Sequence, residues 1–128
     1  IPRVHIRMSF DTLEYLRRGG RIGRAQAFLG GLLKVNPVLG IRDGETFPIA
    51  RPRNRAQAMD FLVNFVKGFR RIESLAIEHA TTPDDLETLA ERLRDVVPPE
   101  CIYRSKVGPV VGTHVGPHVL AVAVLEAE

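Results

Sequence analysis

A histidine between two glycines is the residue of this sequence with the clearest capacity for chemistry. His114 lies within the segment Gly112-Thr113-His114-Val115-Gly116-Pro117. The glycines let the backbone come close to a ligand, and the proline stiffens the exit of the segment. An imidazole can donate a hydrogen bond to an acidic ligand or act as a general base near neutral pH. We therefore expect His114 to contact a ligand; the alternative is that it only pins its loop.

A second glycine-rich segment, far upstream, is the expected companion of His114. Gly19-Gly20-Arg21-Ile22-Gly23 separates two predicted helices, so backbone N–H groups and the forked guanidinium of Arg21 could meet a carboxylate or a phosphate. The segment lacks the spacing of a dinucleotide fingerprint and the Gly-Lys-Ser/Thr ending of a P-loop. The two segments together predict an anion-binding site built from opposite ends of the chain. The alternative is that the paired glycines merely end a helix and the arginine is solvated.

The remaining histidines and the cysteine give no catalytic or metal centre. His114 and His118 have the four-residue spacing of a helical metal site, but Gly116 and Pro117 argue against a helix there, and no acidic partner is close in sequence. No serine lies on a G-x-S-x-G turn, so no Ser/His/Asp triad is expected. Neither a metal nor a cofactor is therefore predicted, and a hydrolase with His114 as base stays a remote alternative to a non-catalytic protein.

Composition places the chain among ordinary globular domains. It has 128 residues, of which 45% are hydrophobic and 26% charged, with a net charge of +3. This is the size of one domain, and no apolar run approaches the roughly 20 residues of a membrane span. Because the sequence starts at Ile1 without a methionine or a signal peptide, we interpret residues 1–128 as one domain of a longer protein. Cys101 is the only cysteine, which excludes an internal disulfide and favours the cytoplasm; in its apolar context it is expected to be a small buried hydrophobe in a strand.

Basic residues gather in two clusters, which leave open a different function. One cluster comprises Arg17, Arg18, Arg21 and Arg24, and the other comprises Arg51, Arg53 and Arg55. Such clusters attract anions even when the net charge is small, so an anion-binding or nucleic-acid-binding domain is the alternative hypothesis. Nucleic acid is disfavoured as a partner, because only 6% of the residues are aromatic and no RNA-binding motif occurs.

Hydrophobic periodicity predicts the elements that must position these residues. Alternating apolar and polar residues from Arg3 to Phe10 predict a half-exposed strand. The full set of predicted strands spans residues 3–10, 37–41, 45–50, 73–79, 101–107 and 118–125, and the predicted helices span 11–18, 24–34, 58–69 and 82–93. Asp43-Gly44 predicts a hairpin turn. Ser9 or Asp11 is expected to cap the first predicted helix, and Thr82 is expected to cap the helix 82–93. Because one strand pair is a hairpin, we expect an α/β (α+β) fold: a mixed, largely antiparallel six-stranded sheet flanked by about four helices.

Taken in order, these segments resemble the C-terminal domain of the DegV family. The resemblance is carried by a strand followed by Asp11-Thr12-Leu13-Glu14-Tyr15-Leu16, Gly19-Gly20-Arg21-Ile22, Asn36-Pro37-Val38-Leu39, Asp43-Gly44 and Gly112-Thr113-His114-Val115-Gly116-Pro117. It spans nearly the whole chain. One position departs from the family pattern, because His118 stands where the family usually continues with a glycine.

The resemblance implies a function that the residues alone do not give. Members of the family bind a long-chain fatty acid in bacterial cells, and many present it to a separate kinase that makes acyl phosphate for phospholipid synthesis. It implies a two-domain parent whose N-terminal domain supplies hydroxyl groups to the carboxylate. On this basis His114 is the expected head-group residue, Arg21 supports it, and Gly20, Thr113 and Gly116 form the supporting loop. The apolar residues of the predicted helix 58–69 and of residues 28–33 could line an acyl slot, or could be plain core.

Overall fold

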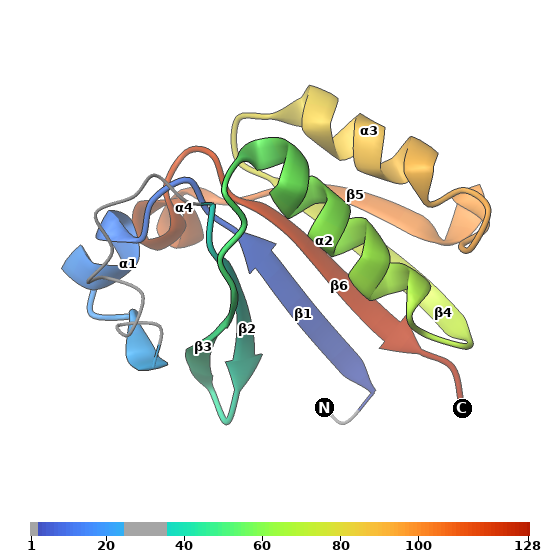
Figure 1. Ribbon diagram of the computed structural model, residues 1–128, viewed down its shortest axis with the longest axis horizontal. Coiled ribbons are helices and arrows are strands. Elements are labelled where there is room, and N and C mark those ends of the chain that lie inside the picture. The colour runs from blue at the N-terminus through green and yellow to red at the C-terminus, as the bar shows by residue number, and fades with distance from the viewer. Residues whose placement is uncertain (1–2, 25–35) are drawn as a thin grey trace.

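The computed structural model describes residues 3–24 and 36–128, which form a six-stranded sheet with two longer helices on one face and two short helices at one end (Figure 1). In chain order the elements are β1 (Val4–Ser9), α1 (Glu14–Arg18), β2 (Val38–Arg42), β3 (Glu45–Ala50), α2 (Arg55–Lys67), β4 (Ile72–His79), α3 (Pro83–Arg92), the 3-10 helix η2 (Pro99–Cys101), β5 (Ile102–Lys106), α4 (Pro109–Val115) and β6 (Leu120–Glu126). No helix within the described ranges is long and apolar enough to cross a membrane.

The sheet confirms the predicted mixed and largely antiparallel architecture. Its strand order is β3-β2-β1-β6-β4-β5. Every neighbouring pair is antiparallel except β4 and β5, which are parallel and joined through α3. The predicted hairpin is also confirmed: Asp43 and Gly44 have φ angles of 53° and 77°, the left-handed conformation that a two-residue turn requires and that Asp-Gly tolerates.

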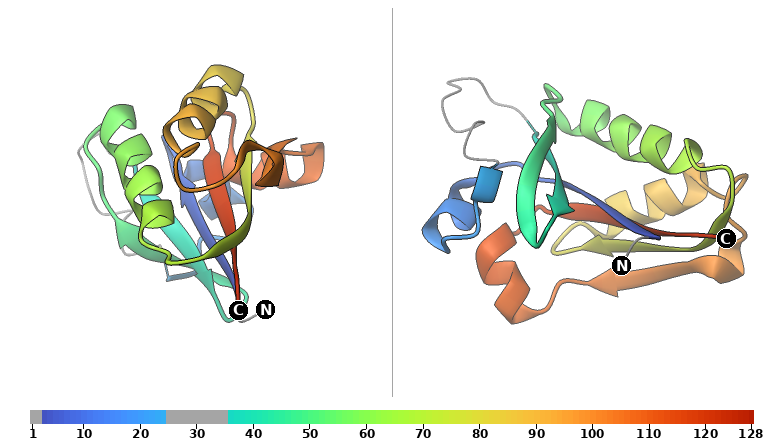
Figure 2. Two further views of the ribbon diagram at one scale, coloured as in Figure 1. Left: turned by 90° about the vertical axis from the view of Figure 1, so that its right-hand side faces the viewer. Right: turned by 90° about the horizontal axis from the view of Figure 1, so that it is seen from below.

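The main core lies between the sheet and the helices α2 and α3, which run side by side over the same face (Figure 2). Helix α2 begins at a capped end, because the Asn54 side chain accepts a hydrogen bond from the Gln57 N–H at 2.9 Å. In α3 the predicted face is buried, comprising Leu86, Leu89, Ala90 and the following Leu93. The predicted start of α3 is confirmed, with Thr82 as the N-cap residue and Pro83 in the first turn, but the expected capping hydrogen bond is not: the Thr82 hydroxyl makes no cap bond and instead accepts a hydrogen bond from Arg55.

Strand β1 is confirmed, but its polar side does not face open solvent. Arg7 and His5 are register partners of Val122 and Val124, which belong to the core under α2, so both side chains lie on the helix-covered face. The guanidinium of Arg7 stacks 4.5 Å from the centroid of the Phe65 ring. Burial lowers the pKa of Arg7 from its ordinary value, and nearby Arg42 lowers it further. The rings of Phe65 in α2 and Phe47 in β3 thus stabilise the Arg7 cation on the helix-covered face, although the sequence alternation predicts that Arg7 faces solvent.

Three further predictions about the elements need correction or fall outside the described residues. Helix α1 starts after Leu13, without a side-chain cap from Ser9 or Asp11. Cys101 is half-buried in the 3-10 helix and not in a strand. The predicted helix 24–34, and with it the apolar residues 28–33, lies almost wholly outside the described ranges. The sequence also missed α4, because glycines and β-branched valines are poor helix formers.

Candidate functional site

His114 lies in the last turn of α4, where the sequence had predicted a loop. Helix α4 begins after Gly108 with Pro109 in its first turn, a position at which the missing proline N–H is no loss. Gly116 ends it with a φ angle of 88°, a conformation that favours glycine. The helix stops before Pro117, so His114 and His118 do not share a helical face.

The end of α4 packs closely against α1 at two glycines, Gly19 and Gly116. A Cβ atom built on Gly19, the residue that ends α1, would lie 2.1 Å from Nδ1 of His114. A Cβ atom on Gly116 would lie 2.7 Å from the ring of Tyr15 in α1. Distances this short leave no room for a side chain. The imidazole therefore lies directly against the backbone at the end of α1, and its position depends on the glycine at 19.

The hydrogen-bonding capacity of His114 is unused within the described part of the chain. Its Nδ1 is buried and has no hydrogen-bond partner there, and its ring makes none of the side-chain hydrogen bonds found among the described residues. Buried polar atoms nearly always have a partner, so an unpartnered one calls for an explanation. Because Nδ1 is packed against Gly19, a ligand would meet the other ring nitrogen, Nε2, which also makes no hydrogen bond among the described residues.

A cavity of about 530 Å³ lies beside this imidazole, within the range typical of small-molecule sites. Its apolar wall is formed by Met8, Phe10, Leu16, Ile41, Val110, Val111 and Val115, and its other lining residues are Gly20, Arg21, Gly23, Gly44, Glu45, Thr46 and His114. The residues come from β1 and the residue that follows it, from α1 and the glycine-rich segment after it, from the β2–β3 hairpin and from α4. An apolar chamber with one imidazole and one guanidinium at its wall can accept an apolar molecule that carries an acidic group.

Arg21 is the second predicted residue that lines this cavity. Its guanidinium donates a hydrogen bond to the Gly19 carbonyl at 2.8 Å, which ties the side chain to the end of α1. The same segment is fastened to β3, because the Thr46 hydroxyl donates to the Arg21 and Ile22 carbonyls at 3.0 Å and 2.6 Å. A guanidinium has five N–H donors, so Arg21 can keep this tether and still donate to an acidic ligand.

The other predicted site residues have different positions. Gly20 lines the cavity, with a φ angle of 72°. Thr113 and Gly116 do not line it: the Thr113 hydroxyl donates to the Pro109 carbonyl within α4, and Gly116 is buried against Tyr15. The structure therefore brings His114, Arg21 and Gly20 to one cavity and leaves the other two beside it.

The apolar wall of the cavity was largely missed in the sequence. Of the two alternatives for the predicted helix 58–69, now α2, the structure favours plain core: the helix does not line this cavity and buries its apolar side in the main core. The wall residues Ile41, Val110 and Val111 are 46%, 77% and 51% exposed. Their signal in the sequence was an apolar pair, Val110-Val111, directly before the glycine–histidine segment, and an isoleucine, Ile41, two residues before the Asp43-Gly44 turn.

His118, the departure from the family pattern, points to another neighbour. Its Nδ1 lies 2.7 Å from a carboxylate oxygen of Asp11, and its side chain does not line the cavity. Its carbonyl accepts a hydrogen bond from Arg55 at 2.7 Å. Its side chain therefore does not narrow the cavity but helps hold the loop between α4 and β6.

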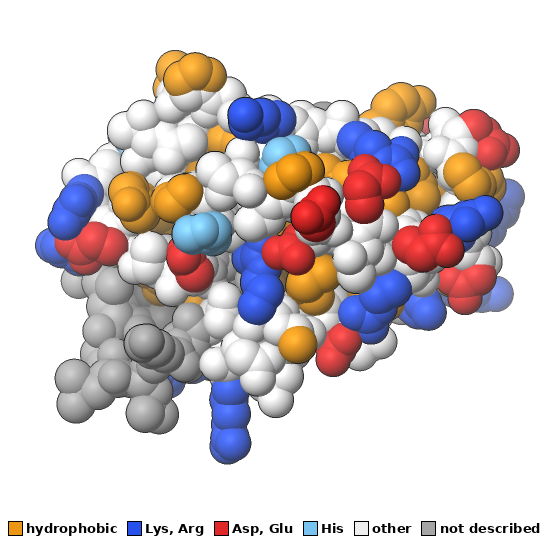
Figure 3. Space-filling model, turned by 90° about the horizontal axis from the view of Figure 1, so that it is seen from above, with side chains coloured by type: hydrophobic (Ala, Val, Ile, Leu, Met, Phe, Trp, Pro, Cys, Tyr) orange, Lys and Arg blue, Asp and Glu red, His pale blue; other side chains and the backbone are white. Residues whose placement is uncertain are grey.

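The arginine clusters are largely engaged in ion pairs. Arg17 and Arg18 both bond to Glu14, and the hydrogen bond from Arg17 lowers the pKa of that carboxyl. Arg55 pairs with Asp85 at 3.0 Å. On the face seen from above, acidic and basic side chains alternate without a continuous basic patch (Figure 3). These ion pairs and the mixed charge of this face give no support to the nucleic-acid alternative, which needs concentrated positive charge.

The described residues contain no group of three potential metal ligands. Within those ranges the site therefore offers hydrogen-bond donors and apolar surface and no metal centre.

Comparison with known proteins points to one family. A family model described as "Uncharacterised protein, DegV family" matches residues 1–127. A DegV domain-containing protein of Streptomyces coelicolor is 42% identical over 118 residues, covering 89% of this chain and 42% of that protein. One from Caldanaerobacter subterraneus is 35% identical and covers 91% of this chain and 43% of that protein. The chain thus spans less than half the length of these relatives.

Solved structures share the fold over nearly the whole chain. A fatty-acid-binding DegV family protein from Thermus thermophilus is 30% identical with a TM-score of 0.87, covering 98% of this chain and 46% of that one. DegV from Bacillus subtilis, described as a fatty-acid-binding protein, is also 30% identical, with a TM-score of 0.79 and the same coverage. At this identity and coverage the likeness extends to sequence as well as fold.

Proposed function

This chain belongs to the DegV family, and from that membership we propose that it is the C-terminal half of a protein that binds a long-chain fatty acid. Two relatives of 30% identity are described as fatty-acid-binding proteins. The observation that carries the proposal is the unbonded His114 at the wall of a mainly apolar cavity of about 530 Å³. A carboxylate needs hydrogen-bond donors, and an acyl chain needs a surface that excludes water.

In this proposal the two parts of the ligand use different parts of the cavity. The carboxylate accepts hydrogen bonds from His114 and from Arg21, while the acyl chain lies along the apolar wall. Burial of each CH₂ group contributes about 0.8 kcal/mol. Affinity therefore rests mainly on the wall, and the selection of an acid over an alcohol rests on the two donors.

The role we infer is binding without catalysis. Among the described residues, none hydrogen-bonds to the His114 ring as a nucleophile or an orienting carboxylate would. We infer that the missing half of the parent completes the head-group site with hydroxyl groups. We also infer that the bound fatty acid is presented in the cytoplasm to a separate kinase that phosphorylates its carboxylate.

The head-group assignment is tested in a longer form of the protein that includes the preceding half. We expect His114→Ala to lose a hydrogen bond to a charged group, worth about 1.5–3 kcal/mol, or roughly a tenfold to hundredfold loss in affinity. Titration of a fluorescent fatty acid measures this, and His5→Ala is the control because that ring lies in β1 and does not line the cavity. An unchanged affinity in His114→Ala contradicts the assignment.

The acyl wall is tested separately. Val111 is 51% exposed and lines the cavity, so Val111→Glu is expected to leave the fold intact and to reduce fatty-acid binding by desolvating a charge against the acyl chain. Tyr103 is 61% exposed and lines neither this cavity nor another described here, so Tyr103→Glu is the control. Equal affinities of the two variants would show that the acyl chain lies elsewhere.

A further inference from the structure

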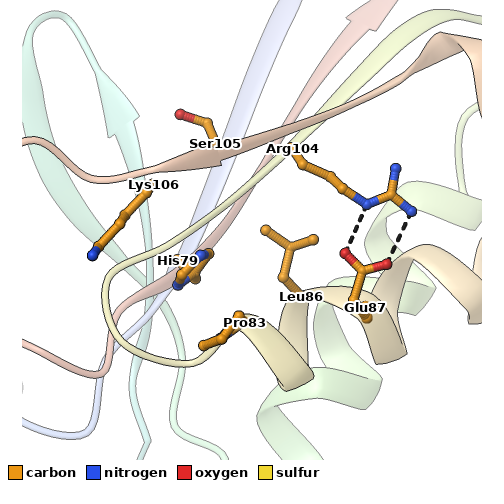
Figure 4. A pocket seen from close by; sticks show the side chains of 7 residues that line it. All are labelled: His79, Pro83, Leu86, Glu87, Arg104, Ser105 and Lys106. Carbon is orange, nitrogen blue, oxygen red and sulfur yellow. Dashed lines mark hydrogen bonds and ion pairs between the residues drawn. The ribbon is translucent and has the colours of Figure 1, made fainter.

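A second pocket, of about 210 Å³, lies where β4 and β5 end and α3 begins (Figure 4). It shares no lining residue with the cavity beside His114. Its polar lining residues are His79, Glu87, Arg104, Ser105 and Lys106. A ligand held there would touch none of the residues that line the cavity beside His114.

The topology brings two of these side chains together from distant parts of the sequence. His79 and Lys106 are register partners at the last residues of the parallel strands β4 and β5. They lie on the side of the sheet that α3 covers, because Ile77 and Leu75, two and four residues before His79, are buried in the core with α3. Ligands of α/β folds bind in the crevice beyond the carboxyl ends of parallel strands.

Neither of these two groups has a partner within the described part of the chain. Nδ1 of His79 is buried without a hydrogen-bond partner, and the ring makes no side-chain hydrogen bond there. Lys106 forms no ion pair with any described residue. In Figure 4 both side chains lie on the same side of Leu86. Nδ1 is shielded from solvent, so an anion in the pocket would meet the exposed Lys106 ammonium and the other ring nitrogen of His79, Nε2, which also has no hydrogen-bond partner among the described residues.

The other polar groups of the pocket are already engaged. Arg104 bonds to both carboxylate oxygens of Glu87, at 2.7 Å and 3.1 Å. Ser105 donates to Glu78 at 3.0 Å. The fork of the arginine, which suits a planar carboxylate, is thus occupied by Glu87. The pocket lining holds one carboxylate, Glu87, and two permanent cations, Arg104 and Lys106. Because Glu87 pairs with Arg104, Lys106 has no counter-charge in the lining.

We propose that this pocket binds a phosphate group through Lys106 and His79. The free donors are an ammonium and an imidazole at the ends of two neighbouring parallel strands, and a tetrahedral anion has enough oxygens to accept a hydrogen bond from each. An ammonium acts on phosphate as a point charge and needs no planar match. A phosphate would also give Nε2 of the His79 ring a hydrogen-bond acceptor.

The test is titration of the full chain with inorganic phosphate, followed by NMR at constant ionic strength. We expect saturable shifts of resonances from His79, Lys106 and the first turn of α3. Lys106→Met should weaken the binding at least tenfold. Lys67→Met removes a lysine elsewhere, and Ser105→Ala removes a pocket hydroxyl that is already bonded; both should bind phosphate as the unchanged protein does. Methyl phosphate in place of phosphate tests whether the group is held as a free ion or as a monoester, and tight binding of either supports the site.

Three outcomes overturn the proposal. Shifts that do not saturate, or that weaken equally in Lys106→Met and Lys67→Met, show only general attraction to positive charge. Shifts centred on His114 and Arg21 place the anion in the other cavity. Acetate binding as tight as phosphate shows that the pocket does not select a tetrahedral anion. Lys106 is exposed, so its replacement tests the site without disturbing the core.

Discussion

Gly19 controls the position of the His114 ring, although the two residues share no hydrogen bond. The missing side chain leaves the space that the ring fills, since a Cβ atom there would lie 2.1 Å from Nδ1. At the scale of single residues, the site is therefore shaped as much by an absent side chain as by a functional one.

Gly19→Ala is expected to displace the His114 ring and to destabilise the protein by about 1–3 kcal/mol, as overpacking does. Denaturant unfolding measures the stability, and the His114 ring resonances report the displacement. Gly112→Ala is the matched control in the neighbouring helix: its Cβ would lie 3.8 Å from Val107, an ordinary contact. Removing a glycine from a helix interior is expected to stabilise by about 0.5–1 kcal/mol. Equal effects of the two substitutions would contradict the packing argument.

The sequence identified His114 and Arg21 as candidates from residue type and glycine context. It could not show that the two share a cavity, because they are 93 positions apart and meet only through the packing of α1 against α4. The role of Gly19 was also hidden, since paired glycines at a helix end have an ordinary explanation as a cap. Local patterns reveal chemistry in a side chain, whereas its neighbours depend on the whole fold.

Helix α3 and strand β5 are tied together by the Glu87–Arg104 ion pair, which also forms a wall of the second pocket. The hydrogen bond from Arg104 lowers the pKa of Glu87, and the same contact raises the pKa of Arg104. The pair therefore connects the crossover helix to the edge strand that follows it.

Glu87→Gln is expected to lower the melting temperature slightly at pH 7. Because the folded-state pKa of Glu87 is depressed, its contribution to stability is present above the unfolded pKa of about 4.3 and is lost as pH falls through the folded value. The melting temperatures of the variant and the unchanged protein should therefore converge under acid conditions. Glu100→Gln, which removes an exposed carboxylate without an ion pair among the described residues, should show no such convergence. A difference that is independent of pH would mean that the charge of Glu87 is not what matters.

At the scale of elements, strands and long helices were predictable and α4 was not. Alternation, the Asp-Gly turn and the leucine spacing of α3 each specify their element locally. Helix α4 is seven residues long and contains Val110, Val111 and Gly112, which have low helix propensity. Its conformation is stabilised by packing against α1. Helix α1 lies about 95 residues earlier in the chain, so the local sequence of α4 does not contain this information.

The larger of the two buried clusters found among the described residues joins α2 and α3 to the sheet. Leu62 is fully buried in it, so Leu62→Ala is expected to cost about 2–5 kcal/mol. Val110→Ala, at a residue 77% exposed, should change stability by less than about 0.5 kcal/mol. Urea unfolding measures both. A loss below about 1 kcal/mol in Leu62→Ala would show that this core does not hold the two layers together.

The fold class could be predicted as a whole, because the order of elements and one certain hairpin restrict the sheet to a mixed arrangement. The strand order could not, since nothing in Val4–Ser9 indicates that its neighbours are β2 and β6. The placement of Arg7 under α2 was equally hidden, because it depends on which face of the sheet the helices cover.

The pairing of β1 with β6 has a consequence for the time course of folding. These strands lie side by side in the middle of the sheet, with Val4 opposite Leu125. The two halves of the sheet, β3-β2-β1 and β6-β4-β5, are therefore joined by the pairing of β1 with β6. Bringing β1 and β6 together closes a loop of most of the chain, which costs entropy before the pairing contributes any stability. Proteins rich in such long-range contacts fold slowly. During synthesis β1 must wait for β6 to leave the ribosome. Until then, one edge of β1 offers unpaired backbone groups to any passing strand.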